Sequence, residues 1–96
     1  MYLTVHNQLT LLHDLLDEQV TFRTVSHEEY QQIKKLVQTI IANKNMDSEL
    51  LNILPEIYHY GMKGEVANSF TDHINEYEPK IEKWLEMINR SKKYIS

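Results

Sequence analysis

The sequence has no cysteine, and its 96 residues include only two glycines and two prolines. Without cysteine the chain can form neither a disulfide nor a thiolate metal site, and it has no thiol nucleophile. Two glycines and two prolines leave little material for the many turns of a β-sandwich or β-barrel. Because Ile, Leu, Val and Phe make up more than a quarter of the residues, the chain has enough apolar surface to fold. These features predict a small all-helical protein.

Glycine loops that cradle phosphate groups are also missing. Gly61 and Gly64 fit neither the G-x-x-x-x-G-K-[ST] nor the G-x-G-x-x-G pattern, which excludes nucleotide binding through such a loop. A helix-turn-helix DNA reader needs polar and basic residues on its second helix. Residues 48–60 contain no Lys or Arg, which argues against that function.

Long apolar runs are absent from the sequence. No stretch approaches the roughly 20 apolar residues of a membrane span. Residues 1–13 contain no Lys or Arg and no continuous apolar segment, so they do not resemble a secretory signal. We therefore expect a cytoplasmic protein that has no membrane partner.

The charges are unevenly distributed along the sequence, with a net negative charge over residues 1–29 and 61–79 and a net positive charge at the C-terminal end. Fourteen acidic and ten basic residues give a net charge of −4, which disfavours general nucleic-acid binding. Residues 80–96 are the one basic region, and cations near a helix C-terminus complement the helix dipole. An alternative hypothesis is that Lys92 and Lys93 form a patch for phosphate or anionic lipid, beside Trp84 and Tyr94.

Helical periodicity begins near the N-terminus. Apolar residues there are separated by four, three and four positions: Val5, Leu9, Leu12 and Leu16. This spacing predicts an amphipathic helix over residues 4–18. Residues 19–25 show no sustained period, so we expect a connection that tucks Val20 or Phe22 into the core.

The clearest local signal follows this connection. Ser26 and Glu29 have the spacing of a capping box, in which each side chain bonds the backbone N–H of the other residue. Val25 and Tyr30 have the spacing of a hydrophobic staple. A second helix therefore begins after Ser26 and continues to about residue 43.

A third helix is predicted from Asp47 or Ser48 to Gly61, which suits a left-handed terminating residue. Pro55 lies inside it and lacks a backbone N–H. Because the apolar stripe keeps its phase across Pro55, we expect one kinked helix. Residues 62–68 are expected to be a flexible connection.

The fourth helix has the most regular pattern. Ser69 and Asp72 suit its start, and Pro79 is expected to kink the helix without ending it. From Phe70 onward, apolar residues repeat at spacings of four and three, as in a helix that packs at a shallow angle. They are Phe70, Ile74, Tyr77, Ile81, Trp84, Ile88 and, after a gap at Ser91, Ile95.

Four amphipathic helices joined by short connections predict a single domain over residues 1–96, folded as an up-down-up-down four-helix bundle. A three-helix core with the first helix packed crosswise is the alternative.

Residues able to carry chemistry are few. His13 and Asp17 lie four apart with Asp14 nearby, and Glu56 and His59 form one Glu-x-x-His pair. Metal sites in ferritin-like bundles need two such pairs and further glutamates. We therefore expect no metal, no cofactor and no catalytic residues.

The sequence is comparatively rich in aromatic residues that carry a polar group, with six tyrosines and one tryptophan. Tyr58 and Tyr60 point about 200° apart on a helix, so they cannot both face the core. Aromatic residues with a polar tip favour protein interfaces as well as core edges. We predict a partner-binding surface that includes Tyr60, Met62 and Trp84.

Several short motifs follow one another along the chain: Gln8-x-x-Leu11-Leu12-x-Asp14-Leu15-Leu16, Thr24-Val25-Ser26, Glu56-Ile57-Tyr58-x-Tyr60, Asp72-His73-Ile74 and Trp84. In these motifs and their order, the chain resembles the YtzH-like family of small uncharacterised proteins from spore-forming Gram-positive bacteria. The resemblance implies a cytoplasmic helical protein with no assigned activity and supplies no functional residues.

The leading hypothesis for function is a non-enzymatic interaction or regulatory module that docks a partner protein or a second copy of itself. The alternative is a small metal-dependent or ligand-binding helical protein using His13, Asp14 and Asp17, or Glu56 and His59.

Overall fold

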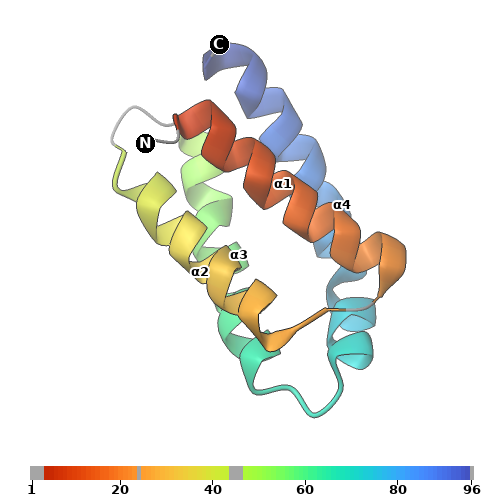
Figure 1. The fold of residues 1–96 in the computed structure, drawn as a ribbon. Coiled ribbons are helices and arrows are strands. Elements are labelled where there is room, and N and C mark those ends of the chain that lie inside the picture. The colour runs from red at the N-terminus through yellow and green to blue at the C-terminus, as the bar shows by residue number, and fades with distance from the viewer. Residues whose placement is uncertain (1–3, 24, 44–46, 96) are drawn as a thin grey trace.

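The computed structural model describes residues 4–23, 25–43 and 47–95, the last three of these as backbone only. It contains four helices: α1 (Val5–Phe22), α2 (His27–Ile41), α3 (Ser48–Glu65) and α4 (Phe70–Ile95). Figure 1 shows α1 lying along α4, and α2 lying along α3.

The contacts between helices define the bundle. Each helix contacts the next in the chain and α4 contacts α1, while the diagonal pairs, α1 with α3 and α2 with α4, make no close backbone contact within the described ranges. The most extensive contacts join α2 to α3 and α1 to α4. This arrangement confirms the up-down four-helix bundle, and α1 packs along α4 instead of crossing the bundle.

The core is built from the apolar stripes of all four helices. At least one residue in each turn of every stripe is buried, which removes the apolar faces from water and stabilises the bundle. The buried apolar residues are Leu9, Leu12, Leu15, Leu16, Tyr30, Ile33, Leu36, Val37, Ile40, Leu50, Ile53, Leu54, Ile57, Tyr60, Ile74, Ile81, Trp84 and Ile88.

Helix α1 is longer than the sequence pattern indicated. It starts at the predicted place, where Thr4 Oγ1 accepts a hydrogen bond from the Asn7 N–H at 3.0 Å, but it continues through Phe22. The prediction that residues 19–25 form a connection was therefore wrong for the first four of them. Phe22 is 67 % exposed, and Arg23 ends the helix in a left-handed conformation with φ of 58°.

The capping box predicted for α2 is confirmed. The Glu29 carboxylate accepts a hydrogen bond from the Ser26 backbone N–H at 2.9 Å. This bond fixes the start of α2 immediately after the short connection from α1.

Helix α3 begins as predicted, with the Asp47 side chain accepting from the Glu49 N–H at 3.3 Å, and it runs through Pro55 without a break. It does not end at Gly61, which lies inside the helix, as does Gly64. Both glycines are buried at the contact with α2. A Cβ at Gly64 would lie 2.3 Å from the Tyr30 ring, so glycine serves here to let two helices approach closely.

Helix α4 follows its predicted pattern. Ser69 Oγ accepts from the Asp72 N–H at 3.2 Å, and the helix is continuous through Pro79. Ile74, Ile81 and Trp84 are buried as the seam requires. The side chain of Ile95 lies outside the described residues.

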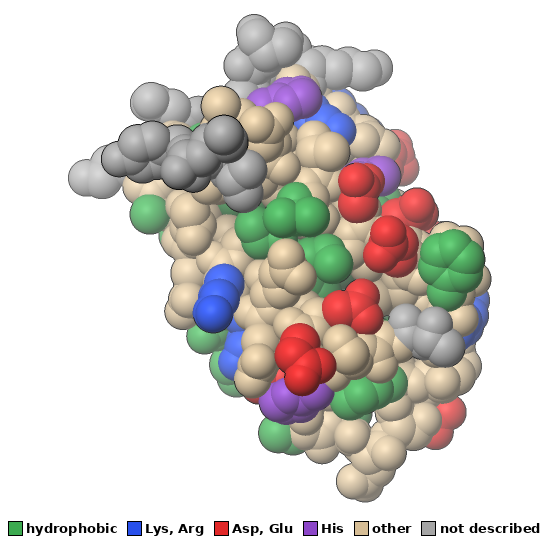
Figure 2. Space-filling model, viewed as in Figure 1, with side chains coloured by type: hydrophobic (Ala, Val, Ile, Leu, Met, Phe, Trp, Pro, Cys, Tyr) green, Lys and Arg blue, Asp and Glu red, His purple; other side chains and the backbone are tan. Residues whose placement is uncertain are grey.

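Acidic side chains gather on the face that α1 and α2 present in Figure 2. Asp14, Asp17 and Glu18 are exposed on the C-terminal half of α1. Their like charges make this face unfavourable for a phosphate backbone.

Candidate functional site

The three residues predicted to bind a partner do not share a surface. Tyr60 is fully buried and Trp84 is only 2 % exposed, whereas Met62 is 44 % exposed. The expected location of Tyr60 and Trp84 at the surface was wrong, because both lie on the inward stripes of their helices. Of Tyr58 and Tyr60, it is Tyr58 that lies at the rim of the core, where it is partly buried.

Tyr60 lies at the centre of a buried aromatic cluster. Its ring stacks on His73 with centroids 4.7 Å apart and planes inclined by 13°. Tyr30 and Trp84 meet it edge-on at 5.6 and 5.8 Å. His73 Nε2 lies 3.0 Å from the Tyr60 carbonyl oxygen, so this nitrogen carries the proton and donates. His73 is therefore a packed and hydrogen-bonded core residue.

The Tyr60 hydroxyl donates a hydrogen bond to Gln19 Oε1 at 2.5 Å. Burial raises the pKa of Tyr60 well above its usual value of 10.0, and burial also raises the pKa of Tyr30. Both phenols thus stay neutral over the physiological pH range. Gln19 Nε2 is buried without a partner in hydrogen-bond geometry. The Tyr30 hydroxyl also lacks a partner in strict geometry, although it interacts with the Tyr60 hydroxyl.

Sequence reasoning missed Gln19 because it is polar. The signal was nevertheless present, since Gln19 continues the four-three spacing of Leu9, Leu12 and Leu16 by one more step. A polar residue on an apolar stripe needs a buried hydrogen-bond partner, which Tyr60 supplies.

A hollow of about 310 Å³ opens between α3 and α4. Trp84 and Tyr77 contribute aromatic surface, while charged and titratable side chains are contributed by both helices. Its lining residues are Pro55, Glu56 and His59 from α3, and Tyr77, Lys80 and Trp84 from α4.

A second hollow of about 330 Å³ follows along the same two helices. It is lined by Glu49 and Asn52 from α3, and by Lys83, Glu86, Met87 and Arg90 from α4. The two hollows together are called the α3/α4 groove below. Backbone contacts between α3 and α4 are much less extensive than those between α2 and α3.

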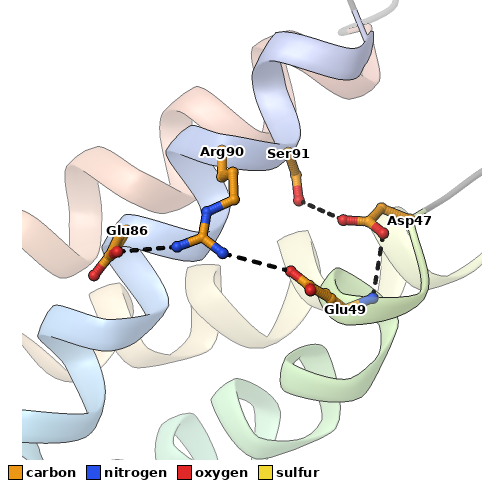
Figure 3. A network of polar contacts seen from close by, with 5 residues as sticks. All are labelled: Asp47, Glu49, Glu86, Arg90 and Ser91. Atoms are coloured by element: carbon orange, nitrogen blue, oxygen red, sulfur yellow. Dashed lines mark hydrogen bonds and ion pairs between the residues drawn. The ribbon is translucent and has the colours of Figure 1, made fainter.

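A polar network closes one end of the α3/α4 groove (Figure 3). Arg90 lies 3.8 Å from a Glu49 carboxylate oxygen across the groove and 3.0 Å from Glu86 on its own helix. Ser91 Oγ donates to Asp47 at 3.2 Å, and Asp47 also caps α3. These contacts join the start of α3 to the C-terminal part of α4.

Farther along the groove, side chains of opposite charge line the same hollow without forming an ion pair among the described residues. Glu56 and Lys80 line the first hollow, yet neither forms an ion pair in the part of the chain that the structure describes. Lys80 Nζ lies 5.6 Å from the centroid of the Tyr77 ring, and Lys83 has no ion-pair partner among the same residues. The groove therefore offers unpaired charges beside an aromatic surface.

The candidate metal ligands stay dispersed. His13 Nδ1 lies 3.3 Å from Asp14 Oδ1, and Glu56 and His59 line one hollow. Among residues 4–23, 25–43 and 47–95, no group of three or more His, Asp or Glu side chains could hold a metal ion.

Within those ranges, no helix combines the length and apolar character needed to cross a bilayer.

Comparison with known proteins places this helical architecture in a family. A family model described as "YtzH-like protein" matches residues 3–88. The chain belongs to the YtzH-like family. It is 28 % identical over 89 residues to "Uncharacterized protein YtzH" of Bacillus subtilis strain 168, an alignment that covers 93 % of this chain and 97 % of that protein. No solved structure matches the chain.

Membership in the YtzH-like family confirms the resemblance drawn from the sequence motifs. The region matched by the family model includes α1, α2 and α3 completely and α4 as far as Ile88. Both walls of the first hollow therefore lie in the part of the chain shared with YtzH-like proteins.

Proposed function

We propose that this chain is a non-enzymatic protein-binding module that receives a segment of a partner protein in the α3/α4 groove. The observation that supports this proposal is the first hollow, where Tyr77 and Trp84 lie beside Glu56 and Lys80, two charges that form no ion pair with any residue the structure describes. Protein interfaces draw much of their binding energy from aromatic residues in desolvated pockets, and charges around them select the partner.

Trp84 acts in this proposal as the floor of a pocket. Because Trp84 is only 2 % exposed in the free chain, the surface that an anchor side chain would cover is supplied mainly by the half-buried Tyr77 and the exposed Pro55, and a rigid pocket costs little entropy on binding. Met62 lies outside the α3/α4 groove residues and is 44 % exposed on α3. It stays a separate predicted contact, as does a cytoplasmic location for the protein.

Site-specific photocrosslinking tests the proposal. A photoreactive phenylalanine analogue would replace Lys83 in the groove and, as a matched control, Gln32 on the exposed surface of α2. The chain would be expressed and irradiated in the bacterium that naturally produces it. We expect a discrete protein adduct from the Lys83 position and none from Gln32.

The adduct must also be reproduced with purified components. The captured protein, purified separately, should bind the unmodified chain and change the emission of Trp84, the only tryptophan in the sequence. Equal crosslinking from both positions, or no adduct from Lys83, would contradict groove binding.

A second candidate function is binding of a metal ion or small ligand, because Glu56 and His59 line the same hollow as Trp84. Zinc titration followed by Trp84 emission tests it. Saturable binding that is lost in both Glu56→Gln and His59→Ala would favour this alternative, and the absence of any change would exclude zinc at these residues.

A further inference from the structure

We infer that the segment received by the α3/α4 groove is an amphipathic helix with acidic side chains along one flank, basic side chains along the other and an apolar anchor between them. This inference rests on the proposed function and specifies the chemistry of the partner. It is drawn from the length of the groove, the charges of its two walls and the aromatic surface that lies between them.

The dimensions favour a helical occupant. On α3, the groove extends from Glu49 to His59, which at 1.5 Å per residue is about 15 Å, the length of about three helical turns. Its walls are two adjacent helices, and side-chain ridges of a third helix can pack into the groove between them. Recognition of an amphipathic helix by an apolar groove is a common mode of peptide binding.

The two walls have opposite charge. The α3 wall carries Glu49 and Glu56 and has no Lys or Arg. The α4 wall carries Lys80, Lys83 and Arg90, and its one acidic residue, Glu86, pairs with Arg90. Complementary flanks on the occupant would therefore be basic toward α3 and acidic toward α4.

Most of these opposite charges do not pair with one another across the groove in the described structure. Its walls are bridged by the Arg90 to Glu49 contact at the closed end, whereas Glu56, Lys80 and Lys83 form no ion pair in the described residues. A helix bound between the two walls would place its own charged side chains beside Glu56 on α3 and beside Lys80 and Lys83 on α4. A uniformly acidic or uniformly basic helix would satisfy one wall and be repelled by the other.

The anchor position is set by the first hollow. The half-buried Tyr77 presents ring surface there, Pro55 adds exposed apolar surface from α3, and the nearly buried Trp84 lies behind them. A Leu or Phe side chain of the occupant would cover this surface and exclude water from it. Because the tryptophan is unique in the sequence, its emission reports directly on occupancy of this hollow.

Three synthetic helical peptides test the inference. They share one apolar stripe, contain no tryptophan and have blocked ends, but their flanks are acidic and basic, both acidic, or both basic. Binding would be followed by Trp84 emission and by amide chemical shifts of α3 and α4. We expect the mixed-charge peptide to bind about tenfold more tightly than either of the others at low salt, with the difference shrinking as salt is added.

A charge-neutralised chain provides the control. Glu56→Gln, Lys80→Gln and Lys83→Gln together change only exposed positions, and circular dichroism would verify the fold. In this triple variant the three peptides should bind within about twofold of one another. Persistence of the full preference would contradict the assignment of these three residues.

The outcomes separate this inference from the proposed function. If a uniformly charged peptide binds the groove as tightly as the mixed-charge one, or if none of the three binds, the inference is wrong. Concentration-dependent shifts of the same amides without peptide would identify a second copy of the chain as occupant and would also overturn it. The proposed function is judged independently by the crosslink from Lys83.

Discussion

Tyr60 on α3 donates its phenol hydrogen to Gln19 on α1 at 2.5 Å, and this bond joins two helices that make no close backbone contact in the described structure. Both residues are fully buried. The bond therefore crosses the core along a diagonal of the bundle. A buried polar pair of this kind specifies one relative position of two helices, because any slip leaves polar atoms unpaired.

Removing the Tyr60 hydroxyl should lower the stability of the fold, because the buried Gln19 Oε1 atom loses its hydrogen-bond donor. Tyr60→Phe leaves Gln19 Oε1 buried without its hydrogen bond, so we expect the free energy of unfolding to fall by about 1 to 3 kcal/mol. Urea denaturation of the variant and the parent chain, monitored by circular dichroism, measures the difference.

Tyr30→Phe is the matched control for that experiment. The Tyr30 hydroxyl interacts with the Tyr60 hydroxyl but has no partner in strict hydrogen-bond geometry, so its removal should lower the free energy of unfolding by less than removal of the Tyr60 hydroxyl does. A larger loss in Tyr30→Phe than in Tyr60→Phe would contradict the assignment of the bond to Tyr60.

Alkaline pH should destabilise the fold. Burial raises the pKa of Tyr60 and of Tyr30 above the usual 10.0, so above about pH 10 the unfolded chain loses phenol protons that the folded chain retains. The unfolded state then binds fewer protons, and stability falls as pH rises. The contribution of the two phenols is complete below about pH 10 and is lost progressively above it.

Urea denaturation at about pH 8 and above pH 10 tests this dependence. The double variant Tyr30→Phe with Tyr60→Phe keeps every lysine, so its curve isolates the phenol contribution. We expect a shallower loss of stability with pH in the double variant. Identical slopes would show that the two phenols are not responsible.

The two glycines of α3 should differ in their tolerance of a methyl group. A Cβ at Gly64 would lie 2.3 Å from the Tyr30 ring, whereas at Gly61 the nearest atom is Lys34 Cγ at 2.9 Å. A buried aromatic ring cannot move aside as a lysine side chain can, so Gly64→Ala should destabilise the fold by about 1 to 3 kcal/mol. In thermal unfolding, the melting temperature of Gly64→Ala should be well below that of Gly61→Ala.

Gly61→Ala combines two opposing effects. Alanine favours a helix interior over glycine by about 1 kcal/mol, but the added Cβ would lie 3.3 Å from the Tyr30 carbonyl oxygen. We expect a net change smaller than that of Gly64→Ala. Equal losses in the two variants would argue against the close approach of the Tyr30 ring to Gly64.

The start of α2 should depend on its capping box. Ser26→Ala removes the N-cap side chain and should lower the free energy of unfolding by about 1 kcal/mol. Ser48→Ala is a suitable control, because Ser48 follows the Asp47 cap of α3 and is exposed. An equal effect of the two changes on chemical denaturation would contradict a specific role for Ser26.

Local sequence signals determined most of the secondary structure. The helical spacing of apolar residues predicted where all four helices lie, and the side chains of Ser26, Asp47 and Ser69 marked the starts of α2, α3 and α4. The Thr4 cap at the start of α1 was seen only in the structure. These signals are local because a helix bonds residues four apart and its cap bonds residues three apart. The continuity of α3 and α4 across Pro55 and Pro79 followed from the unbroken phase of the stripe.

Tertiary contacts decided what the local signals could not. Gln19 extends α1 because Tyr60, 41 positions away, supplies its buried partner. Gly61 and Gly64 remain helical because α2 approaches them, although glycine in sequence more often indicates a helix end.

The candidate site was the least predictable feature. Periodicity could place Trp84 on an apolar stripe, but it could not show that this nearly buried residue would line a hollow with Glu56 and Lys80. That juxtaposition depends on the register of α3 against α4, which is set by packing between residues far apart in the chain. Local sequence patterns were sufficient to predict four helices and their inward faces, whereas the charges that face one another across the groove depend on how those helices pack.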